Sequence, residues 1–380
     1  MSHGNRFLNR RDALKLGLAA GATLALGPNA LFAQGSSGEL LSKPIPSSGE
    51  RIPLIGIGTA RRYDVAATEE ELAPLREVLR NFPGMGGKLI DTAPSYGNAE
   101  TVVGNLLAEL GIRDQIFLAT KVGAGRQGRA AGLAEMQGSL ERLQTDHFDL
   151  LEIHNLAGTA EMLPLLREWK QESKIRYYGI TTTSKEQYAE LAGFMRSEPL
   201  DFIQVDYAID NRSAEDLLLP LAQERGIAVL TALPFGRGRV FDAFGDTPVP
   251  EWAAELGIET WAQFALKFNV SHPAITAAIP GTARPEYLVD NFNASRGILP
   301  DAATRQRHIR TAGVKAVGRH RQHLRVVRQH QRLAIANEYI QGSVALLDRA
   351  DLDQFVQADD GLITGIKQVI RRRCRASTGR

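Results

Sequence analysis

The chain has 380 residues, of which 43% are hydrophobic and 23% are charged, and its formal net charge is +2 at pH 7. The hydrophobic share is that of a soluble globular protein, and the small net charge predicts no general attraction to nucleic acid. The single cysteine, Cys374, excludes a disulfide within the chain and a cysteine-ligated metal site. No spacing of the histidines predicts another metal site, so we expect none.

Residues 1–33 are similar to an export signal. Arg10 and Arg11 precede a short apolar run over 16–26, and the segment ends in small residues at Ala33. These are the parts of a secretory signal, and the arginine pair resembles the bacterial twin-arginine signal. We expect a periplasmic or exported protein that meets the export machinery, or a cytoplasmic one if the signal does not function. An N-terminal arm without a targeting role is the alternative.

Residues 34–50 are rich in Ser, Gly and Pro, which indicates a linker. After it, apolar strand-like segments alternate with helix-like segments. The expected strands cover 52–59, 88–93, 116–122, 148–154, 175–181, 202–207, 227–232 and 274–279. The expected helices cover 68–82, 99–110, 133–143, 162–173, 184–196, 214–225, parts of 251–268, and 285–294. Thr68, followed three residues later by Glu71, predicts a capping box at the first helix.

Eight strand–helix units predict a parallel sheet that is covered on both faces. Eight units in roughly 250 residues are typical of an α/β protein with a closed (β/α)8 TIM barrel, which we place at 51–300. An open doubly wound sheet is the alternative, but its G-x-G-x-x-G fingerprint does not follow the first strand.

Residues 301–380 are expected to form a basic C-terminal extension. No Asp or Glu occurs between Ala302 and Asn337, whereas arginines crowd there. A basic stretch can bind nucleic acid or anionic lipid, but we expect a surface extension without a nucleic-acid partner. Out-of-frame sequence is the alternative interpretation.

Polar side chains stand at the ends of several expected strands. Asp91 ends the second strand and Tyr96 lies in its loop, while Lys121 and His154 end the third and fourth, and the sixth carries Gln204. Each has an ordinary structural explanation when taken alone: a turn-capping acid, a packed ring, a rim lysine or a core histidine. Polar groups at the ends of buried strands are costly unless paired, and barrel chemistry gathers at the carboxyl ends of the strands. We therefore expect these side chains to converge on one mouth.

The motifs at these positions resemble those of the aldo/keto reductase family. Asp-Thr-Ala-Pro-Ser-Tyr-Gly-Asn-Ala-Glu at 91–100 is similar to its most specific signature. Lys121 in Ala-Thr-Lys-Val and His154 in Asp-Leu-Leu-Glu-Ile-His resemble two further motifs, and Ile-Pro-Gly-Thr at 279–282 resembles its late cofactor segment. The resemblance runs from about residue 51 to 299.

The resemblance implies NADPH-dependent reduction of the carbonyl of a small aldehyde or ketone, or the reverse oxidation of an alcohol, with NADH as an alternative cofactor. It implies that Tyr96 is the general acid and base and that Lys121 lowers the pKa of Tyr96. Asp91 would hold Lys121, and His154 would orient the carbonyl. The resemblance implies no particular oligomeric state.

The cofactor-binding positions that the resemblance implies are Thr181, Thr182, Gln204, Pro280, Gly281, Thr282, Arg284 and Asn291. Two departures stand out. Gly281 replaces a common lysine, so Arg284 would supply charge to the 2′-phosphate. Ala232 occupies the place of a tyrosine that stacks on the nicotinamide in many members. A non-catalytic nucleotide- or ligand-binding barrel in the cell envelope is therefore the alternative function.

Overall fold

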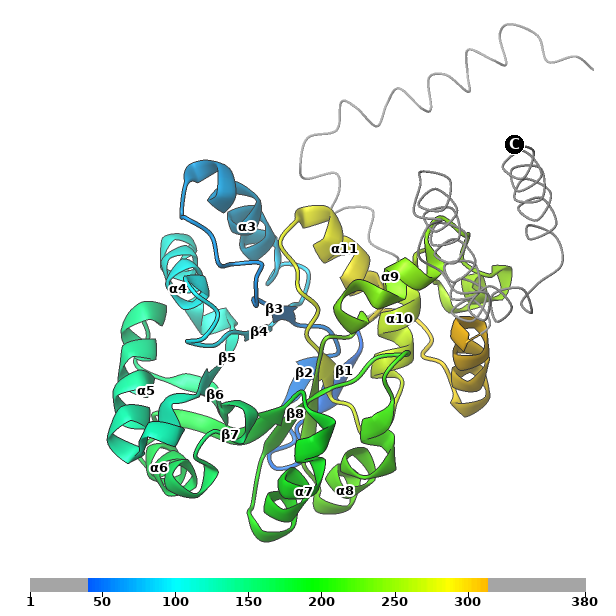
Figure 1. Cartoon of the computed structure of the whole chain (residues 1–380). Helices are drawn as coiled ribbons and strands as arrows, with labels where there is room; N and C mark the ends of the chain where they lie inside the picture. Colours follow the sequence, from blue (N-terminus) through cyan, green and yellow to red (C-terminus); the bar gives the residue numbers. More distant parts are fainter. Residues whose placement is uncertain (1–39, 314–380) are drawn as a thin grey trace, which may run out of the picture. The chain divides into compact units, whose positions relative to one another are not determined.

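Eight parallel strands surround a common axis in the computed structural model, which describes residues 40–313 (Figure 1). Their order around the sheet follows the chain. The strands are β3 (Ile57–Gly58), β4 (Leu89–Asp91), β5 (Phe117–Val122), β6 (Phe148–Ile153), β7 (Ile175–Thr182), β8 (Phe202–Asp206), β9 (Ala228–Ala232) and β10 (Ala277–Ala278). Parallel bridges from Ile55 to Ala278 and from Gly58 to Gly281 join the last strand to the first. The sheet is therefore the closed barrel that the sequence predicted, not the open alternative.

Helices cover the outside of the barrel. They are α3 (Glu69–Asn81), α4 (Ala99–Leu110), α5 (Arg129–Leu143), α6 (Thr159–Gln171), α7 (Tyr188–Ser197), α8 (Leu218–Arg225), α9 (Arg239–Phe244), α10 (Trp261–Val270) and α11 (Pro285–Asn293). Helix α3 begins as predicted, because the Thr68 hydroxyl accepts from the Glu71 amide and itself contacts the Glu71 carboxylate. Helix α4 has the predicted bounds, and it ends at Gly111 in the left-handed region at φ 65°.

Short 3₁₀ turns occupy many of the connections. They are η2 (Arg113–Gln115), η3 (Ala124–Gln127), η4 (His154–Leu156), η5 (Lys185–Gln187), η6 (Ser213–Asp216), η7 (Gly236–Gly238) and η8 (Glu251–Leu256). The predicted helix at 184–196 is thus η5 followed by α7, and the Ser184 hydroxyl contacts Glu186 instead of capping α7.

Alternate strand residues fill the barrel interior. Leu89, Phe117, Leu150, Tyr177 and Phe202 belong to one buried apolar cluster. The intervening residues face outward and pack against the helices in a larger cluster. This two-residue alternation is the normal geometry of a strand, and it decides which side chains at the strand ends can reach the mouth.

A β-hairpin closes the amino-terminal end of the barrel, which we call the base. Strand β1 (Ser42–Pro44) pairs antiparallel with β2 (Arg51–Pro53), and Ile45 and Ile52 are buried in the interior cluster. The Lys43 ammonium donates to the carbonyls of three residues, at 2.6–2.9 Å: Val270, His272 and Ile275. The predicted linker is therefore wrong from Ser42 onward, because its Ser, Gly and Pro residues form the turn of a hairpin. The predicted first strand is likewise divided into β2 and β3.

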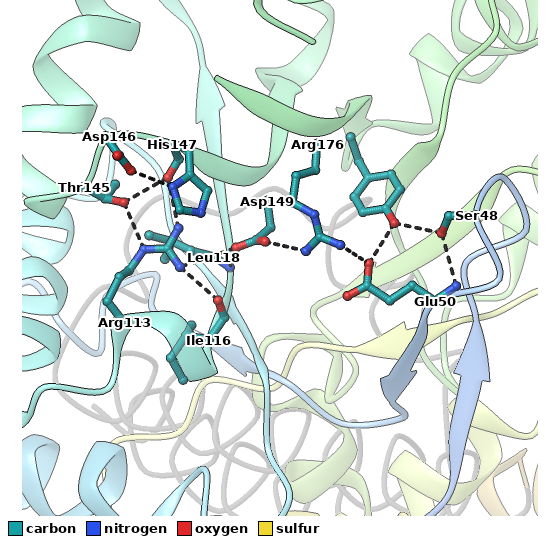
Figure 2. A network of polar contacts seen from close by, with 11 residues as sticks. Ser48, Glu50, Arg113, Ile116, Leu118, Thr145, Asp146, His147, Asp149 and Arg176 are labelled. Carbon is teal, nitrogen blue, oxygen red and sulfur yellow. Dashed lines mark hydrogen bonds and ion pairs between the residues drawn. The ribbon is translucent and has the colours of Figure 1, made fainter. Parts of the chain in front are cut away.

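Polar contacts fasten this hairpin to the sheet (Figure 2). Arg176 donates to Asp149 at 2.7 Å and also pairs with Glu50 of the hairpin. The Tyr177 hydroxyl lies 2.7 Å from both Glu50 and Ser48. The base is thus a network in which each carboxylate has several partners.

The barrel unit continues past its predicted end at residue 300. Residues 302–313 are helical, and Arg305 donates to the Phe268 carbonyl and, at 2.7 Å, to the Tyr207 hydroxyl. His308 is fully buried against aromatic rings. The predicted extension is therefore wrong in its first residues, because Arg305 is a buried anchor and not a solvated charge. The expected export signal at 1–33, the first residues of the expected linker, and residues 314–380 of the basic extension lie outside the described residues. Between residues 40 and 313, no helix has the length and apolar character needed to cross a membrane.

Candidate active site

The predicted side chains converge at the carboxyl ends of the strands. Asp91 ends β4, Lys121 lies near the end of β5, His154 follows β6, and Gln204 lies on β8. Tyr96 lies in the loop between β4 and α4, and its ring faces both Lys121 and His154. Five separate segments therefore build one cluster, as the strand-end argument predicted.

Lys121 and Asp91 form a buried ion pair at the centre of this cluster. The Lys121 ammonium lies 2.7 and 2.8 Å from the two Asp91 oxygens and 2.9 Å from the Thr92 carbonyl. These contacts match the three N–H groups of an ammonium. The Gln204 amide adds a bond of 2.8 Å to Asp91. Burial alone lowers the pKa of Lys121, but the charge of Asp91 opposes burial and the net pKa is raised, so Lys121 stays charged.

Tyr96 lies over the ion pair. The Lys121 ammonium is 5.1 Å from the centre of the Tyr96 ring. Burial raises the pKa of Tyr96, and the charge of Lys121 lowers it by less, so the net pKa is above its usual value. Lys121 therefore lowers the pKa of Tyr96 as expected, but burial raises it by more, because the phenolate is desolvated.

His154 stands beside the Tyr96 ring. The two ring centres are 5.9 Å apart at an interplanar angle of 84°, and His154 Nδ1 lies 3.3 Å from the Ser95 hydroxyl. Burial and then the charge of Lys121 lower the pKa of His154 to about 4. The imidazole is therefore neutral at neutral pH. When Ser95 donates to Nδ1, the ring proton is on Nε2 and can be donated to a ligand.

The two predicted threonines point to opposite faces of β7. The Thr181 hydroxyl accepts from the Asn155 amide at 3.0 Å, and Asn155 has a left-handed φ of 53° next to His154. Thr181 thus holds the turn that carries His154. The Thr182 hydroxyl is engaged with Gln187 at 2.6 Å within its own loop. The structure therefore brings Thr181 and Gln204 to the cluster but does not bring Thr182 there.

Hydrogen bonds hold the segment Pro280–Thr282 in place, and two arginine side chains lie near it in the structure or in the sequence. Asn291 donates to the Thr282 hydroxyl at 3.0 Å, and both side chains are buried. Gly281 is exposed, and a Cβ atom there would lie 3.2 Å from Cγ of Arg62. Arg62, from the loop after β3, therefore lies over the glycine. Arg284 is also exposed, with its guanidinium 3.8 Å from Glu286.

The signature acid Glu100 has a structural place. It is fully buried on α4 and accepts from Thr120, Ser139 and Arg142, which lie on β5 and α5. Asp64, from the loop after β3, accepts from the Asn98 amide at 2.9 Å. These contacts hold the loop that carries Tyr96 at the end where it joins α4.

Two acidic residues of the mouth were missed by the sequence analysis. Glu152 on β6 is fully buried, and neither of its carboxyl oxygens has a hydrogen-bond partner. Asp206 ends β8, where burial raises its pKa. A signal for Glu152 was present, because it precedes His154 by two residues and must face the same side of β6 as Leu150.

A cavity of about 370 Å³ lies at the base, with Glu50, Lys88, Asp149 and Arg176 among its lining residues. It is at the opposite end of the strands from Asp91 and Tyr96, and it shares Glu50, Asp149 and Arg176 with the network of Figure 2. We assign it to the closure of the barrel. Among residues 40–313, no group of three or more His, Cys, Asp or Glu side chains is arranged to hold a metal ion.

The fold and the strand-end cluster agree with comparisons to known proteins. The model of the aldo/keto reductase family matches residues 54–306. Aldo-keto reductase YhdN of Bacillus subtilis is 35% identical over 167 residues, which are 40% of this chain and half (50%) of that protein. Methylglyoxal reductase YeaE of Escherichia coli is 30% identical over 256 residues, which cover 66% of this chain and 88% of that protein. The structure of an aldo-keto reductase from Klebsiella pneumoniae in complex with NADPH matches with a TM-score of 0.60 at 29% identity, covering 72% of this chain and 96% of that one.

The chain therefore belongs to the aldo/keto reductase family, and it is an oxidoreductase.

Proposed function

We propose that this protein uses NADPH to reduce the carbonyl group of a small aldehyde or ketone, and that it catalyses the reverse oxidation of an alcohol. The observation that carries this proposal is the buried Asp91–Lys121 ion pair beneath Tyr96, with neutral His154 beside it. The NADPH complex of the Klebsiella protein supports the cofactor. NADH is the alternative, because an NADH-specific methylglyoxal reductase of Escherichia coli is 28% identical over 268 residues.

Each side chain has one task in the reduction. NADPH, when bound, supplies the hydride. Tyr96 donates its phenolic proton to the carbonyl oxygen, which gains negative charge as the carbon is reduced. Lys121 stabilises the phenolate that is left, and Asp91 keeps Lys121 in place and charged. His154, as a neutral donor, binds the same oxygen and polarises the carbonyl.

Burial raises the pKa of Tyr96, and this governs how the rates respond to pH. At neutral pH the phenol is protonated, so the acid needed for reduction is already present. The phenolate needed for alcohol oxidation is scarce at that pH. The rate of alcohol oxidation should therefore rise with pH.

The residues present fit a phosphorylated dinucleotide. Exposed Gly281 leaves the backbone of the late segment open to approach, and Arg62 and Arg284 offer guanidinium groups to phosphate. Gln204 uses its amide nitrogen on Asp91, so its side-chain oxygen can accept from the carboxamide of the cofactor. Thr181 supports the turn of His154 and would act through it.

Tyr96→Phe tests the proposal. We expect kcat to fall by roughly 10²–10⁴-fold on aldehyde substrates, because general acid catalysis is lost, while NADPH binding measured by fluorescence stays the same. Tyr188→Phe on α7, away from the cluster, is the matched control and should keep its activity. Turnover by Tyr96→Phe at the unmutated rate would contradict the role of Tyr96. Nucleotide binding without turnover by the unmutated chain would instead favour the non-catalytic barrel.

Arg62 and Arg284 allow a separate test of cofactor choice. Replacing either by alanine should raise the Kd for NADPH by about tenfold and leave the Kd for NADH unchanged, because only NADPH carries the 2′-phosphate. Arg80→Ala, on α3, is the control. Equal losses for both nucleotides would place these arginines at another part of the cofactor.

We further propose export by the twin-arginine route, supported by Arg10, Arg11 and the apolar run that follows them. Cell fractionation of the full chain should find it outside the cytoplasm. Replacing both Arg10 and Arg11 by lysine should retain it inside, whereas Arg6→Lys should not. Unchanged fractionation of the double variant would reject the route.

A further inference from the structure

Glu152 differs from the other buried acids of the barrel. Its side chain is fully buried, yet neither carboxyl oxygen has a partner. Glu100, which is equally buried, accepts three hydrogen bonds, and Asp91 accepts from Lys121 and Gln204. A buried carboxyl group without hydrogen-bond partners destabilises the fold. Its position next to the active site therefore indicates a functional role.

The sheet places Glu152 between the groups of the reaction. It is the register partner of Lys121 across the β5–β6 ladder. Leu150, two residues earlier, belongs to the interior cluster, so Glu152 also faces the barrel interior. His154 lies two residues later. On the other side, β7 presents Gly179 in register, which carries no charge.

Lys121 does not donate a hydrogen bond to Glu152. Its three N–H groups are engaged with the two oxygens of Asp91 and the carbonyl of Thr92. Asp91 and Lys121 already balance each other, so an ionised Glu152 would add a net negative charge that no buried cation offsets. The charged groups that face it are Lys121 on β5 and Asp91 on β4, with Tyr96 above them. Burial accordingly raises the pKa of Glu152 to about 8, against the opposing pull of Lys121.

We propose that Glu152 is a positioning residue that is a neutral acid while the enzyme works as a reductase, and that its ionisation in alkaline solution suppresses alcohol oxidation by holding the proton on Tyr96. The proposal rests on the proposed function of Tyr96. An added negative charge near a phenol disfavours the phenolate, and the charge of Glu152 raises the pKa of Tyr96. Alcohol oxidation starts from the phenolate, so it slows when the proton is held on Tyr96.

The first test is the pH dependence of kcat/KM for alcohol oxidation by the full chain and by Glu152→Gln. The two profiles should coincide below pH 7 and separate above pH 8, where the variant should reach about tenfold higher rates. Glu152→Met should behave like Glu152→Gln, since both lack the charge. Exposed Glu168→Gln is the matched control and should follow the unmutated profile. Coincident profiles at every pH, or a difference that does not vary with pH, would overturn the proposal.

The second test needs neither cofactor nor turnover. An infrared difference spectrum between the unmutated chain and Glu152→Gln should contain the carbonyl band of a protonated carboxylic acid at pH 7, and this band should vanish above about pH 9. Absence of this band at pH 7 would show that Glu152 is ionised and would overturn the proposal that it is a neutral acid. If Tyr96→Phe kept full turnover, the proposed function would fail while the infrared titration still reported the state of Glu152, so the two failures are distinguishable.

Discussion

The two ends of the barrel use similar side chains in opposite ways. At the base, Asp149 accepts from the Leu118 amide and from Arg176, and Glu50 accepts from Arg176 and Tyr177. At the mouth, Asp91 is equally well paired, but Glu152 has no hydrogen-bond partner. The base is therefore arranged for stability, whereas the mouth keeps an unpaired acid at a cost in stability, as functional sites often do. Four predictions test this comparison.

Lys121→Met should have the largest effect. It would leave the Asp91 carboxylate buried without a cation beside it, which costs about 3–5 kcal/mol of the free energy of unfolding, and turnover should fall at least 10²-fold. Urea denaturation and steady-state kinetics measure the two effects. The double variant Asp91→Asn with Lys121→Met should recover most of the stability but no activity. A single variant as stable as the unmutated chain would mean that the pair is not desolvated.

Glu152→Gln should stabilise the protein, in contrast to most substitutions of buried acids. The folded pKa is about 8 and the ordinary value is 4.5, so the folded state binds more protons than the unfolded state between these values. Stability of the unmutated chain therefore falls as pH rises through that window, and at pH 7 the loss is about 3 kcal/mol. The free energy of unfolding of Glu152→Gln should not fall with pH in this way. Denaturation at pH 4.5, 6 and 8 measures it, and parallel curves would contradict the prediction.

Arg176→Met, at the base, should destabilise the fold less than Lys121→Met does. Arg176 is partly exposed, and Asp149 keeps its bond from the Leu118 amide, so we expect a loss of about 1 kcal/mol of the free energy of unfolding. The pH dependence of the reaction should not change, since the site lies at the other end of the strands. A shifted pH profile would show that the two ends are coupled.

The smallest effect should be that of pH on His154. Its pKa is about 4, so the ring does not titrate between pH 5.5 and 7.5. Reduction rates should change less than about twofold across this range. The same pH dependence, measured on Ser95→Ala, tests whether the contact of the Ser95 hydroxyl with His154 affects the reduction rate. A rate that follows a group with a pKa of about 6.5 would contradict the burial of the imidazole.

The fold was largely predictable because its signals are local. The capping box of Thr68 and Glu71 and the apolar spacing of 99–110 each determine one helix by contacts within a few residues. The hairpin of β1 and β2 was not predictable in this way. Its turn composition is that of a linker, and it is ordered by distant groups such as the carbonyls that bind Lys43. Arg305 was misread for the same reason, since its partners lie on α10 and after β8.

The convergence of the strand-end side chains was predictable, but their protonation energetics were not. Strand ends brought Asp91, Lys121 and His154 together as expected. Strand alternation separates Thr182 from Thr181, because adjacent residues of β7 face opposite ways, and the cofactor contacts of both stay predictions. The raised pKa of Tyr96 depends on burial that no local pattern encodes, and so does the isolation of Glu152.

The hairpin at the base also determines how the enzyme could be attached to a solid support. Leu41 of the hairpin donates its amide to the Ser295 carbonyl, and Leu40 forms a bridge to Arg296, so the amino-terminal side of the barrel emerges at the base. Tyr96 and His154 lie at the opposite end of the strands. A bead or electrode coupled at this side would be attached at the end of the barrel opposite to its mouth.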